Sequence, residues 1–188
     1  MDEAILLWIN QSWANPWLDK LFYFASSKTT FALPLGLIIG AYLIYGYKRP
    51  GFNIFIFSIL LIVLSDSLGA ALKSWFAQAR PCVDLPGILR HVIAGVYPDC
   101  GARYDGMPSN HALNFFCLSF FLALILRSKP LFFGLLTISV IVALSRIYLG
   151  HHYPSQVVVG ILIGSILGIV AAYLFSRFSP TGITHSHD

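Results

Sequence analysis

Charged side chains are scarce in this chain of 188 residues, because Asp, Glu, Lys and Arg together make up only 11% of it. A soluble domain usually carries about 25% charged residues, so the scarcity excludes an ordinary soluble domain. In their place, 57% of the residues are hydrophobic and 15% are aromatic, and the mean hydropathy is +0.74. The composition therefore predicts an integral membrane protein.

Clustered positive charge is also lacking, although the formal net charge is +4. The Lys and Arg residues are scattered at the ends of apolar runs and form no basic stripe, which argues against nucleic acid as a partner. The N-terminus has an acidic start and no small-residue cleavage site, which argues against a cleaved signal peptide. Membrane lipids are the expected surroundings, and the sequence does not indicate an oligomeric state.

Five apolar runs come close to the roughly 20 residues that a helix needs to cross a bilayer. They cover about 30–47, 52–74, 109–127, 131–149 and 156–177. We therefore predict an all-α, polytopic membrane bundle with five spans. It forms a single domain over residues 1–178, and the short polar segment 179–188 is expected to be a disordered tail.

The first 26 residues have a different character, with three tryptophans, charges of both signs and an Asn15-Pro16 break. Because Trp rings favour the headgroup region, residues 1–26 are predicted to form a helix lying in the membrane interface. A sixth, tilted span is the alternative.

Positive charges in the short connections predict the orientation. They stand between the first two spans, between the third and fourth, and after the fifth, at Lys48, Arg49, Arg127, Lys129 and Arg177. The positive-inside rule puts these points in the cytoplasm. The loop over 75–108 and the stretch 145–156 then lie outside. In an oxidising compartment we predict a disulfide between Cys82 and Cys100, with free thiols as the alternative.

Polar residues that are unusual in such a chain gather at the predicted outer boundary. Lys73 and Arg80 are seven residues apart, so on a continuous helix they share one face. Ser109 or Asn110 is a natural N-cap, and a helix start with free N–H groups attracts anions. The full set is Lys73, Arg80, Ser109, Asn110, His111, Arg146 and His152.

Three cations and two histidines, with no carboxylate cluster for a metal, predict a phosphate pocket with a nucleophile and an acid. Phosphoryl transfer requires neutralised charge on the phosphoryl oxygens and groups at the entering and leaving positions. One histidine is able to attack phosphorus, and the other to protonate the leaving oxygen.

Three segments carry a resemblance to a known family. They are KSWFAQARP (residues 73–81), PSNH (residues 108–111) and SRIYLGHHYPSQ (residues 145–156). In order and spacing they resemble the K-x6-RP, PSGH and SR-x5-H-x3-D signature of the type 2 phosphatidic-acid phosphatase superfamily of membrane lipid phosphatases. The short chain is similar to small bacterial members, which implies a bacterial inner membrane and an active site facing the periplasm or outside.

The resemblance also implies roles for individual residues. His152 would be the nucleophile that forms a phosphohistidine, and His111 the general acid. No metal or other cofactor would be required. The phosphoryl oxygens would be held by Lys73, Arg80, Ser109, the N–H of Asn110 and Arg146. Where the family has a Gly, this chain has Asn110; where it has the aspartate that orients the nucleophile, this chain has Gln156.

Gln156 leaves several interpretations open. The protein is an enzyme with a less activated histidine, an inactivated enzyme, or a lipid-phosphate binding protein or transporter without turnover. Asp99 and Asp105 are the candidates to replace the missing carboxylate. Asp66 is expected to pair with Lys73 or with a buried polar partner.

The expected substrate is an amphiphile whose phosphate lies at the headgroup level. Undecaprenyl diphosphate, phosphatidylglycerol phosphate, phosphatidic acid and lipid A phosphate all fit, and size and layout favour undecaprenyl diphosphate. The outer loop is the expected selector, and Arg90, His91 and Arg103 are candidates to contact a second phosphate or a sugar.

Overall fold

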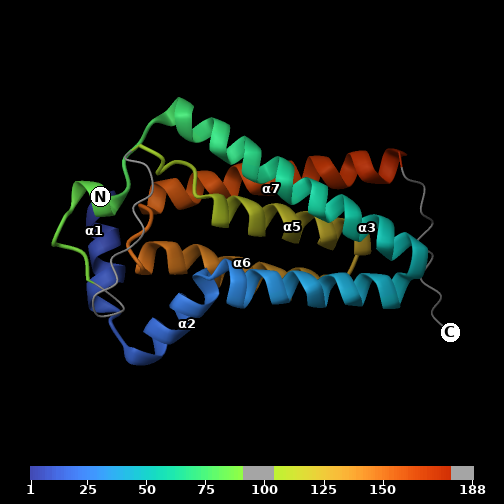
Figure 1. Cartoon of the computed structure of the whole chain (residues 1–188), viewed down its shortest axis with the longest axis horizontal. Coiled ribbons are helices and arrows are strands. Elements are labelled where there is room, and N and C mark those ends of the chain that lie inside the picture. The colour runs from blue at the N-terminus through green and yellow to red at the C-terminus, as the bar shows by residue number, and fades with distance from the viewer. Residues whose placement is uncertain (91–103, 179–188) are drawn as a thin grey trace.

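The computed structural model describes residues 1–90 and 104–178, and the regular elements in these ranges are all helices (Figure 1). In chain order they are α1 (Asp2–Leu7), η1 (Trp8–Ser12), α2 (Pro16–Ser26), η2 (Lys28–Ala32), α3 (Leu33–Phe76), α4 (Pro81–Asp84), α5 (Asn110–Leu126), α6 (Lys129–Tyr148) and α7 (Pro154–Phe178). The predicted all-α membrane bundle is confirmed in its fold class. His91, Asp99, Cys100, Arg103 and the tail 179–188 lie outside the described residues.

The long helix α3 reverses direction at Lys48, where the backbone leaves helical geometry (φ 53°, ψ −127°) two residues before Pro50. Proline lacks a backbone N–H and disfavours helical geometry in the residue before it, so a continuous helix is interrupted there. Figure 1 shows the chain running to the end of the bundle away from α1 and then returning. α3 therefore forms two antiparallel arms, which are joined at the predicted charged connection, Lys48-Arg49.

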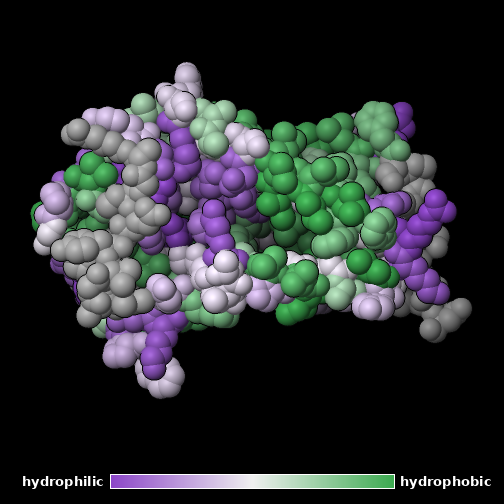
Figure 2. Space-filling view, in the orientation of Figure 1, coloured by the Kyte–Doolittle hydropathy of each residue, from purple (hydrophilic) through white to green (hydrophobic). Residues whose placement is uncertain are grey.

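Among the described residues, three helices are long and apolar enough to cross a membrane: the one containing both arms of α3, α6 and α7. α5 is apolar but shorter, with 17 residues. A hydrophobic region lies between a hydrophilic region toward α1 and a smaller hydrophilic patch at the opposite end (Figure 2). These features describe a multi-pass membrane protein, while the five spans and the interfacial position of residues 1–26 stay predictions.

α5 lies at the centre of the bundle and packs against α7, α6 and α3, most extensively against α7. Glycines spaced four apart on α7 permit this close contact: a Cβ atom at Gly164 would lie only 2.2 Å from the carbonyl oxygen of Leu113. Because the two helices start at the same end of the bundle, their first turns lie side by side. The backbone N–H of Ser109 donates to the carbonyl oxygen of Gln156 at 3.0 Å.

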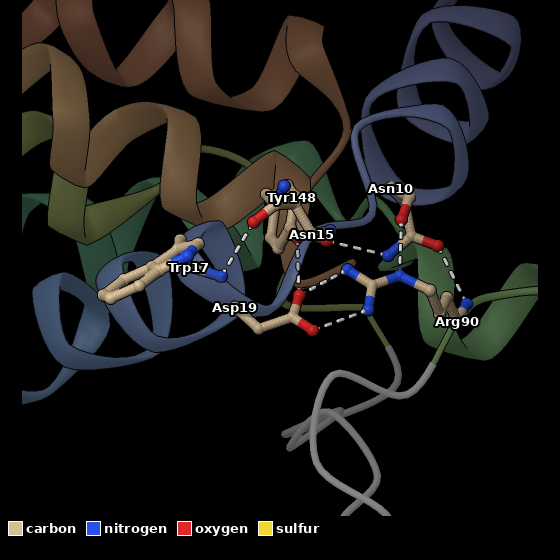
Figure 3. Close-up of polar contacts among 6 residues, drawn as sticks. All are labelled: Asn10, Asn15, Trp17, Asp19, Arg90 and Tyr148. Carbon is tan, nitrogen blue, oxygen red and sulfur yellow. Dashed lines mark hydrogen bonds and ion pairs between the residues drawn. The ribbon is translucent and has the colours of Figure 1, made fainter.

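We predicted one helix for the N-terminal segment, but the structure has three short helices there, α1, η1 and α2. It breaks at Asn15, whose side-chain oxygen accepts from the N–H of Trp17 at 2.8 Å and so caps α2. Polar contacts fix the segment to the bundle (Figure 3): Asn10 donates to the carbonyl oxygen of Tyr148 at 2.7 Å. The segment therefore packs as part of the folded domain.

Arg90, a candidate contact for a second phosphate or a sugar, joins the same network. The guanidinium of Arg90 pairs with the carboxylate of Asp19 at 2.8 Å, and the backbone N–H of Arg90 donates to the side-chain oxygen of Asn10 at 2.8 Å (Figure 3). The hydrogen bond from Arg90 lowers the pKa of Asp19. Arg90 thus anchors the N-terminal segment to the chain that follows α4.

Candidate active site

Three separate parts of the chain converge at one end of the bundle. α3 brings Lys73 in its last turn, and Arg80 directly precedes α4. Ser109 occupies the N-cap position of α5 without a side-chain capping bond, and Asn110 and His111 lie in the first turn. Arg146 lies in the last turn of α6, His152 in the α6–α7 connection and Gln156 in the first turn of α7. The structure therefore brings the three sequence motifs together.

His152 is buried, with only 2% of its surface exposed. Its Nδ1 lies 2.8 Å from the carbonyl oxygen of Gly106 and 3.2 Å from Oε1 of Gln156. Both neighbours are acceptors, so Nδ1 must carry the proton and Nε2 keeps its lone pair. The arrangement leaves Nε2 as the nucleophilic atom of the ring.

Burial and positive charge keep His152 neutral. Burial is the largest cause that lowers its pKa well below 6.5, followed by the charges of Arg146, Arg80 and Lys73. The hydrogen bond to Gln156 acts in the opposite direction. A neutral imidazole surrounded by cations is suited to attack an anionic phosphate ester.

Gln156 is fully enclosed, with 1% exposure, and every polar group of its side chain has a partner. Its Oε1 accepts from the N–H of Tyr153 at 3.2 Å as well as from His152. Its Nε2 donates to the carbonyl oxygen of Ala79 at 2.7 Å. The amide therefore connects the nucleophile to the loop that carries Arg80, a contact that a carboxylate has no N–H to make.

The cations of the first motif are held by Asp105, which corrects the idea that this residue replaces the missing aspartate. Two guanidinium nitrogens of Arg80 donate to its carboxylate at 2.7 and 2.9 Å, and Nζ of Lys73 donates to its carbonyl oxygen at 2.7 Å. A two-point Arg–carboxylate contact fixes the plane of the guanidinium. Asp105 thus positions the cations, and the acceptor beside His152 is the carbonyl of Gly106.

Ser26, at the end of α2, contacts two of the predicted site residues. Its carbonyl oxygen lies 3.2 Å from Nε2 of His111, and its hydroxyl accepts from Nη1 of Arg146. Because a carbonyl only accepts, Nε2 of His111 is the protonated nitrogen. Sequence reasoning missed Ser26, and no local motif marks it.

Ser109 and Asn110 have different surroundings although they are neighbours. The hydroxyl oxygen of Ser109 is buried without a partner among the described residues, which is unusual unless a ligand supplies one. Nδ2 of Asn110 donates to Oδ1 of Asp66 at 2.9 Å. The side chain of Asn110 is therefore turned to Asp66, and its backbone N–H is the group that it can offer to an anion at the start of α5. Asp66 therefore pairs with Asn110 and not with Lys73.

The cysteines differ in state. Cys82 is disulfide-bonded, and Cys117 is free and buried in α5. The predicted partner Cys100 falls outside the described residues.

A groove of about 460 Å³ opens beside His111. Both arms of α3 and α5 form its largely apolar walls, and polar residues line one end. An apolar groove whose lining includes Lys28, Asp66 and His111 fits an amphiphile with a polar head.

Cations and two histidines at the end of an apolar helical bundle define a membrane protein that handles phosphate groups. The sequence model of the PAP2 superfamily matches residues 51–180. The chain belongs to the PAP2 superfamily, which confirms the resemblance to the type 2 phosphatidic-acid phosphatases and marks it as a membrane lipid phosphatase by family.

Relatives and solved structures agree with this assignment. The lipid A 4'-phosphatase of Porphyromonas gingivalis is 31% identical over 169 residues, which cover 87% of this chain and 69% of the relative. The crystal structure of a PAP2-type phosphatidylglycerolphosphate phosphatase from Bacillus subtilis matches with a TM-score of 0.71 at 24% identity, covering 96% of this chain and 87% of that chain. The crystal structure of LpxE from Aquifex aeolicus matches with a TM-score of 0.68 at 24% identity, covering 90% of this chain and 93% of that chain. At this identity the two structures establish the shared fold.

Proposed function

We propose that the protein is a metal-independent phosphatase that removes a phosphate from a membrane lipid through a phosphohistidine intermediate. The observation that carries the proposal is the setting of His152. Its Nδ1–H is held by two acceptors, its Nε2 keeps the lone pair, and three cations surround it. This is the arrangement expected of a nucleophile and not of a structural histidine.

The reaction follows in two steps. Nε2 of His152 attacks phosphorus, and the bond from phosphorus to the leaving oxygen breaks. His111, protonated on both ring nitrogens, donates its Nδ1 proton to that oxygen and keeps its Nε2–H on Ser26, while Lys73, Arg80 and Arg146 neutralise charge on the phosphoryl oxygens. Water then attacks the phosphohistidine, the P–N bond breaks, and His111 accepts a proton from the water.

Gln156 is compatible with turnover. In a serine-protease triad, replacing the orienting aspartate with asparagine lowers kcat by about 10⁴ because the histidine adopts the wrong tautomer. Here Gly106 and Gln156 both impose the Nδ1–H tautomer, so the larger part of that loss does not apply. We therefore favour an active enzyme over an inactivated one.

The site is proposed to face the periplasm or outside of a bacterial inner membrane. The cationic connections at Lys48, Arg127 and Arg177 support this, because they lie at the opposite end from His152 and favour the cytoplasm. The leaving group would enter the groove beside His111 with its apolar part among the lipids. Lipid A phosphate, phosphatidylglycerol phosphate, phosphatidic acid and undecaprenyl diphosphate share the required chemistry.

Phosphate release from these lipids by the purified protein, without added metal, tests the proposal. Native protein should release phosphate and form an acid-labile, base-stable phosphoenzyme, and His152→Ala should do neither. Glu3→Gln, an exposed change in α1, serves as the control and should match native protein.

Release by His152→Ala would contradict the nucleophile assignment, and loss of release on adding a chelator would contradict metal independence. Lipid binding without release would instead identify a binding protein or transporter.

A further inference from the structure

The groove contains a carboxylate that the proposed reaction does not use. Its polar end is lined by Lys28, Asp66, Asn110, His111 and Asn114. Asp66 lies in the second arm of α3, on a stretch apolar enough to cross a membrane, and it is exposed to the groove. Ionisable residues in such helices are energetically costly and usually serve a function.

Two amides hold this carboxylate in place. Oδ1 of Asp66 accepts from Nδ2 of Asn110 at 2.9 Å and from Nδ2 of Asn114 at 3.1 Å. Ser65 donates to the side-chain oxygen of Asn114 at 2.6 Å and so turns its N–H groups toward Asp66. Oδ2 of Asp66 accepts no hydrogen bond from the described part of the chain, so it is available to a ligand.

The same contacts give Asn110 a role of its own. It stands where the family signature has glycine, and its side chain is used to hold Asp66. Gly69 leaves space for it, since a Cβ atom there would lie 2.3 Å from the side-chain oxygen of Asn110. This departure from the signature and the carboxylate therefore form one structural unit.

The unit lies on the side of the leaving group. His111 follows Asn110 directly, and in the proposed reaction it protonates the leaving oxygen. The atoms next to the scissile bond must therefore pass the end of the groove where Asp66 is exposed. The cations that hold the phosphate being removed belong to the other two motifs.

We propose that Asp66 binds hydroxyl or amine donors of the leaving group, so that the protein prefers phosphate esters of sugar or glycerol headgroups to polyprenyl diphosphates. This inference rests on the proposed function. A carboxylate accepts hydrogen bonds from such donors and repels the second phosphate of a diphosphate. Lys28 also lines the groove and offsets the negative charge, but its ammonium accepts no hydrogen bond. Asp66 thus argues against undecaprenyl diphosphate, which size and layout had favoured.

The test compares native protein with Asp66→Asn on phosphatidylglycerol phosphate, lipid A 4'-phosphate and farnesyl diphosphate in one detergent. Native protein should have the higher kcat/KM on the two polyol esters. Asp66→Asn should lower kcat/KM on those two by about tenfold or more, the usual effect of losing a hydrogen bond to a charged group, and should not lower it on farnesyl diphosphate. Glu3→Gln removes one exposed negative charge that does not line the groove and should leave all three values unchanged.

An equal fall on all three substrates, or no change on any, would show that Asp66 only supports the fold and would overturn the inference. If native protein hydrolyses none of them, the proposed function is wrong, and binding decides the matter. The rise in melting temperature caused by each lipid is then compared in His152→Ala with and without Asp66→Asn. A selective loss of the rise with the polyol esters supports the role of Asp66, and equal rises overturn it.

Discussion

At the scale of single residues, the buried amide of Gln156 has two functions in one side chain. Its oxygen orients His152, and its N–H holds the carbonyl of Ala79 beside Arg80. An aspartate in its place would add negative charge next to the nucleophile but is one methylene shorter and lacks the N–H. The gain in charge and the loss of the contact therefore oppose each other.

Gln156→Asp should for this reason change the rate of phosphate release near neutral pH by less than about tenfold. In a serine-protease triad, by contrast, loss of tautomer control lowers kcat by roughly 10⁴. The added carboxylate stabilises protonated His152 and raises its pKa relative to native protein. Neutral His152 is the nucleophile, so the acidic limb of the pH–rate profile should move to higher pH. Rates measured over a range of pH check both statements, and a rise of about 10⁴ would show that the native histidine is not oriented.

Gln156→Leu provides the matched comparison. It keeps an enclosed side chain but leaves the N–H of Tyr153 and the carbonyl of Ala79 without partners, which costs about 1–3 kcal/mol for each buried group. It should lower both the melting temperature and the rate. Its acidic limb should not move upward, because no charge is added.

Much of the site could be predicted from the sequence, because fixed spacing within a motif identifies residues such as Arg146 and His152. Contacts between motifs could not be predicted in this way. The carbonyl of Gly106 is a backbone group that every residue possesses, and Ser26 reaches His111 only because α2 folds back onto the bundle. Asp105 is a candidate replacement carboxylate by sequence, but its position along the chain does not reveal that its carboxylate binds Arg80.

At the scale of helices, α5 carries His111 and packs closely against α7, which begins just after His152. Gly164→Ala would place a Cβ atom 2.2 Å from the carbonyl oxygen of Leu113 and push the helices apart. It should lower the free energy of unfolding by about 1–3 kcal/mol, as overpacked cores do, and also lower phosphate release without altering any polar group. Melting temperature in detergent and phosphate release measure the two effects.

Gly134→Ala in α6 is the control for this substitution, since nothing lies within 4 Å of the added Cβ atom. Alanine favours a helix over glycine by about 1 kcal/mol, so this variant should be as stable as native protein or more stable. If Gly164→Ala behaved like Gly134→Ala, close packing of α5 on α7 would not be what positions the two histidines.

At the scale of the whole molecule, the charged connections and the candidate site lie at opposite ends of an apolar bundle. Ser12 is exposed in η1 at the site end, whereas Gly46 lies next to the turn at Lys48, with open space around an added Cβ atom.

Since positive connections stay in the cytoplasm, a cysteine at position 12 should react with a membrane-impermeant maleimide in intact bacterial cells whose outer membrane has been made permeable. A cysteine at position 46 should react only after the inner membrane is opened. Cys117 is buried and Cys82 is disulfide-bonded, so native protein supplies the background. The opposite labelling pattern would put His152 on the cytoplasmic side and restrict the substrates to lipids of the inner leaflet.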